Sequence, residues 1–457
     1  MANKNLLTYG AKTALVEQAF YSPVAQLSNG QPISTMYCVL CRVDPWIDEN
    51  NPDQPLQSQQ YIKQIYNNIF VAKKINSNNI SPVISRIDWT SGTVYQYYQD
   101  NIDMFNVDLN DTIIQQFYVK NRYNQVFKCL WNANGAVSTN EPVFQPGTFG
   151  SNGIYQSTDG YKWKYIYSID VGSAVKFLDN NWIPVPVGVN TPNPLSTAEG
   201  FGGVEAINVT YGGVGYNTSN DAITVSITGD GTGAAAHVVA NNISGAITDI
   251  VVDSQGSNYT YANVSILSTQ GSGATAIAPV SPIGGHGFDP VSELGCNHVM
   301  YTVEFNGSEG GIMPTDIDYR QVGLLVNPFD NQTLTTGIPA SQSIYPVYEQ
   351  VIVSSGAGTF TNDDFVYQGS STSPTFIGTV LNFDSGNNLI KLINTTGAIN
   401  INNPIFDSLG TARTVLGSSS PTGGFVRYSG YLAYIENRAG VQRSPDGIEQ
   451  FKFVLGY

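Results

Sequence analysis

Residues 428–457 read YSGYLAYIENRAGVQRSPDGIEQFKFVLGY and close the chain with two short β patterns. The first pattern runs from Tyr431 to Glu436 and the second from Gln450 to Leu455, with turn-forming residues at 444–447 between them. This order predicts a hairpin that is rich in aromatic side chains. Because a long tract of Gly, Ser, Thr and Asn precedes it, we expect the hairpin to complete a core that earlier segments build.

The composition favours strands over helices. The chain has 457 residues, of which only 12% are charged, and it contains 46 Gly, 23 Pro, 27 Tyr and 20 Phe. Aromatic side chains fit a pleated sheet, and Gly and Pro fit tight turns. A chain of this length is expected to form about three domains. The sequence therefore predicts a mainly β protein with some α (α+β).

Charge and hydropathy exclude two classes of partner. The formal net charge of −15 repels phosphate, and no cluster of Lys or Arg offers a local positive patch for nucleic acid. No run of eighteen apolar residues is present, and the opening MANKNLLTYG lacks the apolar core of a secretory signal. We therefore expect no nucleic-acid or membrane partner, and a soluble chain that stays in the compartment where it is made.

The four cysteines are too few and too scattered for a disulfide framework. Cys38 and Cys41 form a C-x-x-C within MYCVLCRV, a predicted strand, where their odd separation points the two side chains to opposite faces. That geometry disfavours a shared metal and favours ordinary core thiols. Free thiols fit a reducing cytoplasm.

Two helices are expected near the N-terminus. Apolar residues recur at helical spacing over 59–70, and Ser58 stands where an N-cap is expected. A weaker helical pattern covers Ala11 to Phe20 and is expected to end before Pro23. The first of these is the clearest helix in the sequence.

Strand patterns follow at Thr112 to Lys120, Gln125 to Trp131 and Tyr161 to Ile169. The last alternates strictly and places on one face the aromatic residues Tyr161, Trp163, Tyr165 and Tyr167. Such a wide aromatic face needs cover. Core packing is the favoured interpretation, and a protein interface or a sugar-stacking platform is the alternative.

An internal repeat covers about 200 to 282. INVTYGGVGY at 207–216 matches IVVDSQGSNY at 250–259, and VSITGDGTGAAA at 225–236 matches VSILSTQGSGATA at 264–276. A unit of this size cannot bury one of its faces alone. We therefore expect the two copies to pack together as one small β domain.

A second tract rich in Gly, Ser, Thr and Asn predicts a small barrel or sandwich. Taken together, the patterns predict a discontinuous mixed core domain with two inserted small β domains. The core is expected at 1–199, 283–346 and 425–457, and the insertions at 200–282 and 347–424.

The sequence offers no constellation typical of an active site. The histidines His237, His286 and His298 lack the paired signatures H-E-x-x-H or G-x-S-x-G. The glycine-rich GDGTGA is not followed by the Lys of a phosphate loop, which favours turns. Asp363 and Asp364, and the acidic loop DPWIDENNPDQP at 44–55, lack the alternation of a calcium loop. We therefore expect a protein that is not an enzyme, with no catalytic, cofactor-binding or metal-binding residues.

Seven short segments follow one another in order through the predicted core. They are MYCVLCRVDPW (36–46), VISRIDW (83–89), QVFKCL (125–130), DGYKWKYIYSI (159–169), IPVPVG (183–188), YRQVGLLVNP (319–328) and SGYLAYIENR (429–438). In this order they resemble the baseplate wedge subunits of T-even-type contractile-tailed phages, specifically the dimeric wedge protein of the intermediate baseplate. The residues that carry the resemblance are Trp46, Arg86, Asp88, Trp89, Trp163, Asn327, Pro328, Glu436, Asn437 and Arg438.

The resemblance covers roughly 1–195, 284–346 and 426–457, and the other two tracts look like insertions of the sort seen in marine cyanophage relatives. It implies a homodimer that binds other baseplate wedge proteins. It also implies a location in the virion, at the tail baseplate, after assembly in the host cytoplasm.

Long polar loops are the candidate partner interface, with ordinary solvated loops as an equal alternative. The candidates come from the DPWIDENNPDQP loop and from the polar turn at 438–447. They are Trp46, Asp48, Glu49, Arg438, Gln442 and Arg443.

Two other functions stay open. A tail-associated glycan-binding adhesin is the alternative, because aromatic rings stack on sugars. The rings that motivate it are taken as exposed and lie in the repeat, where a structural role is the favoured interpretation. They are Tyr211, Tyr216, Tyr259 and Tyr261. A glycosidase that uses two carboxylates ranks third.

Overall fold

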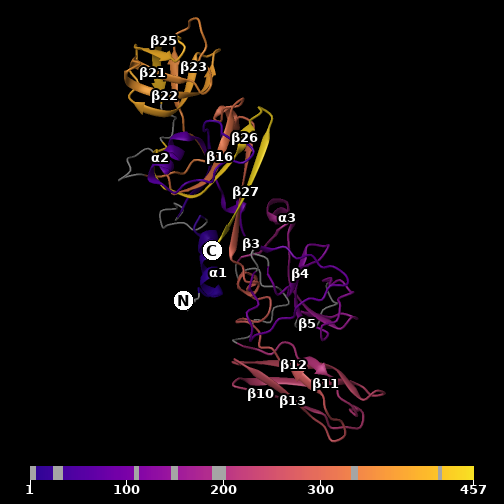
Figure 1. Ribbon diagram of the computed structural model, residues 1–457. Helices are drawn as coiled ribbons and strands as arrows, with labels where there is room; N and C mark the ends of the chain where they lie inside the picture. The colour runs from indigo at the N-terminus through magenta and orange to yellow at the C-terminus, as the bar shows by residue number, and fades with distance from the viewer. Residues whose placement is uncertain are drawn as a thin grey trace. The chain divides into compact units, whose positions relative to one another are not determined.

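The computed structural model describes residues 7–23, 34–107, 113–145, 153–187, 202–330, 338–419 and 425–457. These residues form 27 strands and four α-helices, which confirms a mainly β fold with some α (Figure 1). None of their helices is long and apolar enough to cross a membrane.

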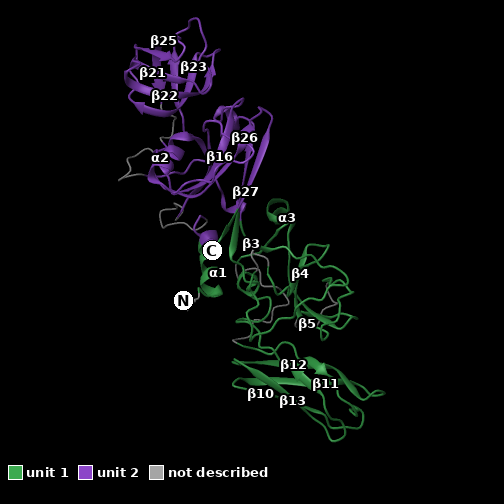
Figure 2. Ribbon diagram, in the orientation of Figure 1, with its two compact units in different colours: residues 1–18, 81–300, 454–457 green, residues 19–80, 301–453 purple. Residues whose placement is uncertain are grey.

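The chain divides into two compact units, and each is discontinuous in sequence (Figure 2). Unit 1 contains residues 1–18, 81–300 and 454–457, and unit 2 contains residues 19–80 and 301–453. These boundaries are not those expected from the sequence. The expected core with two inserted domains stays a prediction.

Unit 2 contains a five-stranded sheet in the order β19-β2-β1-β16-β26. The central strand β1 is buried along its whole length, because it has a strand on either side and helix α2 contributes to the same core. Ser58 caps α2 as expected, since its side chain accepts a hydrogen bond from the Tyr61 amide. The elements are β1 Met36–Cys41, α2 Gln59–Asn68, β2 Ile69–Lys74, β16 Asp318–Val326, β19 Ile344–Pro346 and β26 Tyr431–Gln442, with the small pair β17 Phe329–Asp330 and β18 Ile338–Pro339.

The cysteines of β1 behave as core side chains. Cys41 packs on the same face as Tyr37 and Val39, and Cys38 is not part of that cluster. All four cysteines are free and buried. Burial raises the pKa of the Cys38 and Cys41 thiols well above their ordinary value.

The two last strands do not form the expected hairpin. Strand β26 pairs with β16, and β27 (Ile448–Gly456) belongs to a different sheet, in which β15 (His298–Asn306) is its neighbour. Within unit 2, the rings of Phe451 and Phe453 on β27 pack against Tyr319 and Tyr434 on β16 and β26. The last two strands therefore meet through aromatic faces, and each takes its backbone hydrogen bonds from another strand.

The strands between residues 349 and 419 form a closed six-stranded barrel in the order β20-β23-β22-β21-β24-β25, coloured orange in Figure 1. Aliphatic and phenylalanine side chains fill its interior. Closure leaves the barrel with no free edge strand. The strands are β20 Glu349–Val353, β21 Phe365–Ser370, β22 Ser373–Asp384, β23 Leu389–Gly397, β24 Pro404–Asp407 and β25 Ala412–Ser419.

Unit 1 contains a four-stranded sheet in the order β4-β5-β7-β6. Strands β5 and β7 confirm the predicted strands, whereas β4 is shorter than predicted and Thr112 lies outside the described residues. Residues 161–167 of β7 are all buried, which confirms core packing for the aromatic face. The elements are β4 Tyr118–Lys120, β5 Gln125–Asn132, β6 Ile154–Gln156 and β7 Tyr161–Ser168, together with β3 Ile80–Ser85, β8 Trp182–Pro184, α3 Val171–Phe177 and α4 Pro290–Glu293. Helix α1 (Tyr9–Tyr21) confirms the weaker helical pattern.

The repeat forms two interlocked copies. Strand β10 of the first copy pairs with its counterpart β13, and Ser226 lies opposite Ser265 at the centre of that pair. The outer strands also pair across copies, β11 with β12 and β14 with β9. Each copy therefore completes the other. The strands are β9 Asn208–Tyr211, β10 Thr224–Gly229, β11 Thr232–Asn241, β12 Ala246–Ser257, β13 Ala262–Leu267 and β14 Thr275–Ile277.

Two equivalent tyrosines show the reciprocity of the repeat. The hydroxyl of Tyr216 accepts a hydrogen bond from the Ala274 amide, and that of Tyr259 accepts one from the Ala234 amide. Both rings are buried, at 2% and 3% exposure. This burial confirms the favoured structural role for Tyr216 and Tyr259, because each ring fills the core of the opposite copy, and it removes these two rings from the sugar-stacking alternative.

Candidate functional site

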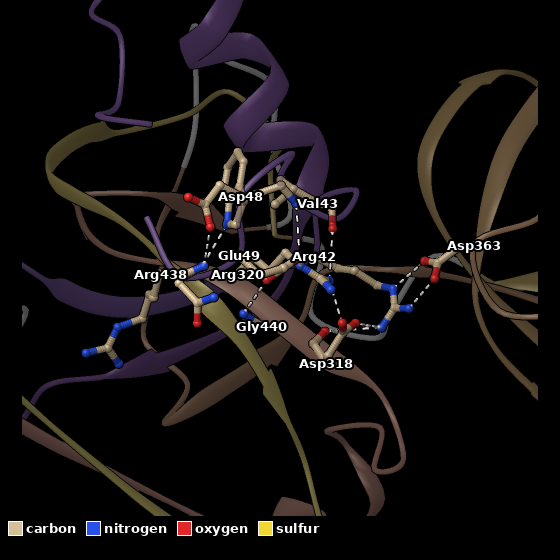
Figure 3. A network of polar contacts seen from close by, with 11 residues as sticks. Arg42, Val43, Asp48, Glu49, Asp318, Arg320, Asp363, Arg438 and Gly440 are labelled. Carbon is tan, nitrogen blue, oxygen red and sulfur yellow. Dashed lines mark hydrogen bonds and ion pairs between the residues drawn. The ribbon is translucent and has the colours of Figure 1, made fainter. Parts of the chain in front are cut away.

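One predicted interface residue, Glu49, belongs to a set of polar contacts in unit 2. We name this set the Glu49 network, and it is formed by Arg42, Glu49, Asp318, Arg320 and Asp363. Figure 3 shows the network with the segments that surround it. One Glu49 oxygen accepts hydrogen bonds from the Trp46 amide at 3.0 Å and from Arg320 Nε at 2.8 Å. Its other oxygen accepts one from the Gly440 amide at 2.8 Å. The loop after β1 is thus fixed onto β26 of the same chain.

The hydrogen bonds of the Glu49 network stabilise its ionised form. The Gly440 amide and the Arg320 guanidinium lower the pKa of Glu49 below its ordinary value. Arg320 also pairs with Asp318, and Asp318 pairs in turn with Arg42. Arg42 binds both carboxylate oxygens of Asp363, which lies in the barrel (Figure 3). The network therefore joins the β1 sheet to the barrel.

The six predicted interface residues fall into three groups. The first group contacts other segments of unit 2. In it, the indole Nε1 of Trp46 donates to the Arg438 carbonyl at 2.7 Å, and Glu49 belongs to the Glu49 network. Asp48 and Gln442 are exposed. Arg443 is fully buried, where it pairs with Glu449 and donates to the carbonyl oxygens of Pro314 and Gly307. The expectation that Arg443 lies in an exposed turn is wrong, because these groups enclose its guanidinium.

The residues of unit 2 that carry the resemblance to the wedge subunits contact neighbouring segments of the same unit. Asn327 adopts a positive φ of 54°, and its side-chain oxygen accepts a hydrogen bond from the Thr35 amide at 2.8 Å. Pro328 is buried beside it. Glu436 pairs with Arg438 at 3.0 Å, and the Asn437 oxygen accepts a hydrogen bond from Gln321 at 2.7 Å.

The residues of unit 1 that carry the same resemblance also contact neighbouring segments. Asp88 pairs with Arg86 at 2.9 Å and with Lys120 at 3.0 Å. Partial burial raises the pKa of Asp88, but hydrogen bonds from these two partners outweigh it and lower the pKa overall. The Trp89 indole donates to Ser138, and Trp163 stacks on Tyr161 in the core. The Asp88 side chain remains partly exposed to solvent.

Sequence reasoning missed a group of buried charges in unit 1, which we name the Lys128 cluster: Lys128, Lys164, Glu205, His286 and Glu293. Lys128 Nζ donates to Glu293 at 2.9 Å, and Lys164 Nζ donates to Glu205 at 2.9 Å. His286 Nδ1 lies 3.1 Å from Lys128 Nζ and 2.9 Å from Glu293 Oε1. The His286 amide donates to Glu205, which joins the two ion pairs.

The four paired side chains of the Lys128 cluster are no more than 2% exposed. Burial raises the pKa of Glu293, but the charge of Lys128 and hydrogen bonds from His286 and Gly287 outweigh it and hold the pKa at about 2. Burial lowers the pKa of His286 and of Lys128. The contact with Lys128 and the low pKa of Glu293 thus favour an ionised Lys128–Glu293 pair beside a neutral imidazole.

The signal for this cluster is a lysine within an apolar strand. Lys128 interrupts QVFKCLW, and Lys164 alternates with the aromatic residues of β7. In an alternating strand the positions between core residues usually face water. Here both faces of β7 are covered, so its lysines need buried partners.

Two cavities lie beside these charged groups. Lys128 and Glu293 line a cavity of about 750 Å³ in unit 1, together with Tyr98, Phe105 and Phe288. In unit 2, a cavity of about 540 Å³ adjoins the Glu49 network and is lined by Arg42, Trp46 and Asp363.

Asp363 and Asp364, two of the acidic residues weighed as calcium ligands, have protein partners. Asp363 binds Arg42, and Asp364 accepts hydrogen bonds from the Phe365 amide and Ser408. In the part of the chain that the structure describes, no group of three or more His, Cys, Asp or Glu is arranged to hold a metal ion.

Comparison with known proteins adds no name to this geometry. A scan against protein-family models finds no match, and a search of the curated proteins finds none.

Proposed function

We propose that this chain is a structural subunit of the baseplate wedge of a contractile phage tail. The observation that carries the proposal is the ordered series of segments that resembles the wedge family. Its role is mechanical: it joins neighbouring wedge proteins and transmits their rearrangement when the tail contracts.

The positions of the resembling segments in the fold support this proposal. Segments 36–46, 319–328 and 429–438 contribute β1, β16 and β26, which are adjacent in one sheet. Their residues meet in register, since Cys41 lies opposite Gln321 and Gln321 lies opposite Asn437. Segments far apart in sequence thus build one frame.

The resembling segments of unit 1 also pair with one another. Segments 125–130 and 159–169 contribute β5 and β7, which are hydrogen-bonded neighbours. Segments 83–89 and 183–188 contribute β3 and β8, which pair at Val83 to Ser85. A rigid frame of this kind suits a subunit that acts through its surfaces.

The proposed partners are a second copy of this chain and other wedge proteins. Asp48 and Gln442 are the predicted interface residues whose side chains are exposed. Strand β26, which carries Gln442, stands at the edge of its sheet. An edge strand offers unpaired backbone groups to another chain.

Mass photometry of the purified full-length chain, with mass spectrometry and cryo-EM of contractile tails from the phage that encodes it, tests the proposal. The expected result is a dimer in solution and density for the chain in the wedge. A monomer that is absent from purified tails contradicts it.

A tail-associated glycan-binding adhesin is the second proposal. It is favoured by Tyr211 and Tyr261 in the repeat, whose side chains are 60% and 53% exposed. Rings at this exposure are free to stack on a sugar. A glycan array of the full-length chain tests it, with Tyr211→Ala/Tyr261→Ala as the variant expected to lose the signal. A signal that this variant retains, or no signal at all, contradicts the proposal.

A further inference from the structure

The cavity of about 750 Å³ in unit 1 has apolar walls that contacts within the fold hold in place. Phe105 packs edge-to-face on Tyr9 with ring centroids 4.8 Å apart, and the Tyr9 hydroxyl donates to the Phe105 carbonyl at 2.7 Å. The Tyr98 hydroxyl donates to the Val280 carbonyl at 3.2 Å. Binding cavities in proteins commonly have volumes of about 300–1,000 Å³ and are largely formed before binding. This cavity has such a size, and its walls are already in place.

Exposed apolar side chains extend the walls of this cavity to the protein surface. Ile102 and Ile283 line the cavity and are 44% and 72% exposed, and Phe288 beside them is half-buried. A small ligand inside the cavity would leave this outer apolar surface in water. A protein partner covers the cavity and the exposed isoleucines together, and exposed apolar surface of this kind is typical of protein interfaces. The walls therefore favour a protein as the occupant.

Three aspartates, Asp100, Asp103 and Asp289, line the same cavity. Asp100 and Asp103 are exposed, and Asp289 is half-buried. Each of the three accepts a hydrogen bond from a backbone amide, at 2.9, 3.0 and 3.3 Å respectively. Because an amide carries no net charge, these hydrogen bonds orient the carboxylates without balancing their negative charge.

The positive charges near the cavity do not balance these aspartates. Lys128 is the lining residue with a positive charge, and its side chain is 0% exposed and paired with Glu293. Lys12 on α1 is not a lining residue; its ammonium lies 5.4 Å from the centroid of the Tyr9 ring and supplies one further positive charge. Negative charge therefore remains in excess, so the cavity repels an anionic group and attracts a cationic one.

From the preformed apolar walls, the exposed isoleucines and the excess negative charge, we infer that this cavity docks an Arg or Lys side chain which a partner protein presents between apolar residues. The aliphatic stem of that side chain packs on the aromatic walls, and its charged head lies near the aspartates. The apolar residues that flank it cover Ile102 and Ile283. The inference rests on the proposed structural role, in which the chain binds other proteins, and it names the surface and the chemistry of one such partner.

Saturation-transfer NMR of the full-length chain with short peptides at millimolar concentration tests the inference. The probe is acetyl-Leu-Arg-Leu-amide, and the charge controls carry Gln or Glu in place of Arg. The expected result is transfer to the Arg peptide, about tenfold weaker binding of the Gln peptide and no binding of the Glu peptide. The inference is overturned if no peptide shows transfer, or if the Gln or Glu peptide binds as strongly as the Arg peptide.

Asp103→Asn/Asp289→Asn locates the binding in this cavity. The change removes two negative charges and keeps the side-chain oxygens that accept the backbone hydrogen bonds, so the thermal unfolding temperature is expected to stay unchanged. The Arg peptide is expected to bind about tenfold more weakly. Asp44→Asn/Asp48→Asn makes the same change of net charge at exposed positions of unit 2 and is the matched control, expected to bind as the unmodified chain does. Equal affinity in the two variants overturns the inference.

Mass photometry of Asp103→Asn/Asp289→Asn identifies the class of occupant. The net charge of −15 makes a second copy of this chain a poorer occupant than a basic protein, so the proposed dimer is expected to persist in this variant. Loss of the dimer would assign the cavity to a second copy and overturn the inference. Incorporation into tails is measured separately. A chain that is present in tails and does not bind the Arg peptide therefore contradicts this inference alone, and a chain that binds it and is absent from tails contradicts the structural proposal.

Discussion

The Lys128 cluster of unit 1 and the Glu49 network of unit 2 use the same kinds of ion pair in different surroundings. In the Lys128 cluster, Lys128 and Lys164 are 0% exposed. In the Glu49 network, Glu49 and Asp363 are 37% and 46% exposed. Water replaces a lost partner at the surface and cannot do so in the core. The ion pairs of the two sites have similar N–O distances, but removing one partner is expected to cost more stability in the buried cluster than at the surface.

The largest expected effect follows from Lys128→Met. The change leaves the Glu293 carboxylate buried without its cation, which is expected to destabilise unit 1 by about 3–5 kcal/mol. Hydrogen–deuterium exchange of β5 and β7 peptides measures the loss. The double variant Lys128→Met/Glu293→Leu removes both charges and is expected to recover most of it. A loss of unfolding free energy below about 1 kcal/mol would contradict the prediction, because surface ion pairs contribute that little.

Acid is expected to weaken unit 1 through Glu293. Its folded pKa of about 2 is below its ordinary 4.5, so the stability it contributes is fully present above 4.5 and is lost as the pH falls toward 2. The loss is on the order of 3 kcal/mol. The lowered pKa of His286 acts in the same direction below its ordinary 6.5, because only the unfolded chain takes up that proton readily.

Exchange measured across this pH range on β5 and β7 peptides tests the acid dependence. In Lys128→Met/Glu293→Leu, which has no Glu293 to titrate, the slope is expected to flatten below pH 4.5. An identical slope in this variant would assign the acid sensitivity to other groups.

A smaller effect is expected from Arg320→Ala in the Glu49 network. Glu49 remains partly in water and keeps its hydrogen bonds from the Trp46 and Gly440 amides. The expected loss is about 1 kcal/mol, and salt is expected to reduce it. Exchange of β16 and β26 peptides at low and high salt measures both. A loss as large as that of Lys128→Met would remove the distinction between the two sites.

The smallest effect on stability is expected from Gln442→Ala, with Asp48→Ala as its companion. Both side chains are exposed, so unfolding is expected to change by less than about 0.5 kcal/mol. Under the structural proposal, Gln442→Ala weakens the dimer, and dilution series in mass photometry detect this. An unchanged dissociation constant in both variants removes these residues from the dimer interface.

Local patterns predicted much of the fold. The N-cap at Ser58 and the strand from Tyr161 depend on spacing within a few residues, and the tandem repeat is visible as two matching stretches of sequence. The buried charges depend on partners far along the chain. Lys164 meets Glu205 41 residues away, and Lys128 meets Glu293 165 residues away. Strand alternation shows that these lysines point to the face opposite the aromatic residues. Only the tertiary fold decides whether other parts of the protein cover that face.

The candidate sites show the same limit. The sequence identified the loop containing Trp46 and Glu49 because it is long and polar. It could not show that Glu49 contacts Gly440, 391 residues later, because no local pattern encodes that contact. The expected hairpin of β26 and β27 was wrong for a related reason, since strand patterns do not specify which strands pair.

The reciprocal repeat has a consequence for how this region assembles. A Cβ atom added at Gly271 would lie 2.3 Å from the Tyr216 ring, and one added at Gly231 would lie 2.4 Å from the Tyr259 ring. Each half is thus shaped to receive the other half. The corresponding half of a second copy of this chain has the same shape, so an exchange of halves between two copies would use the same contacts. The two copies of the repeat thus pack as two subunits of a dimer would, although one chain carries both.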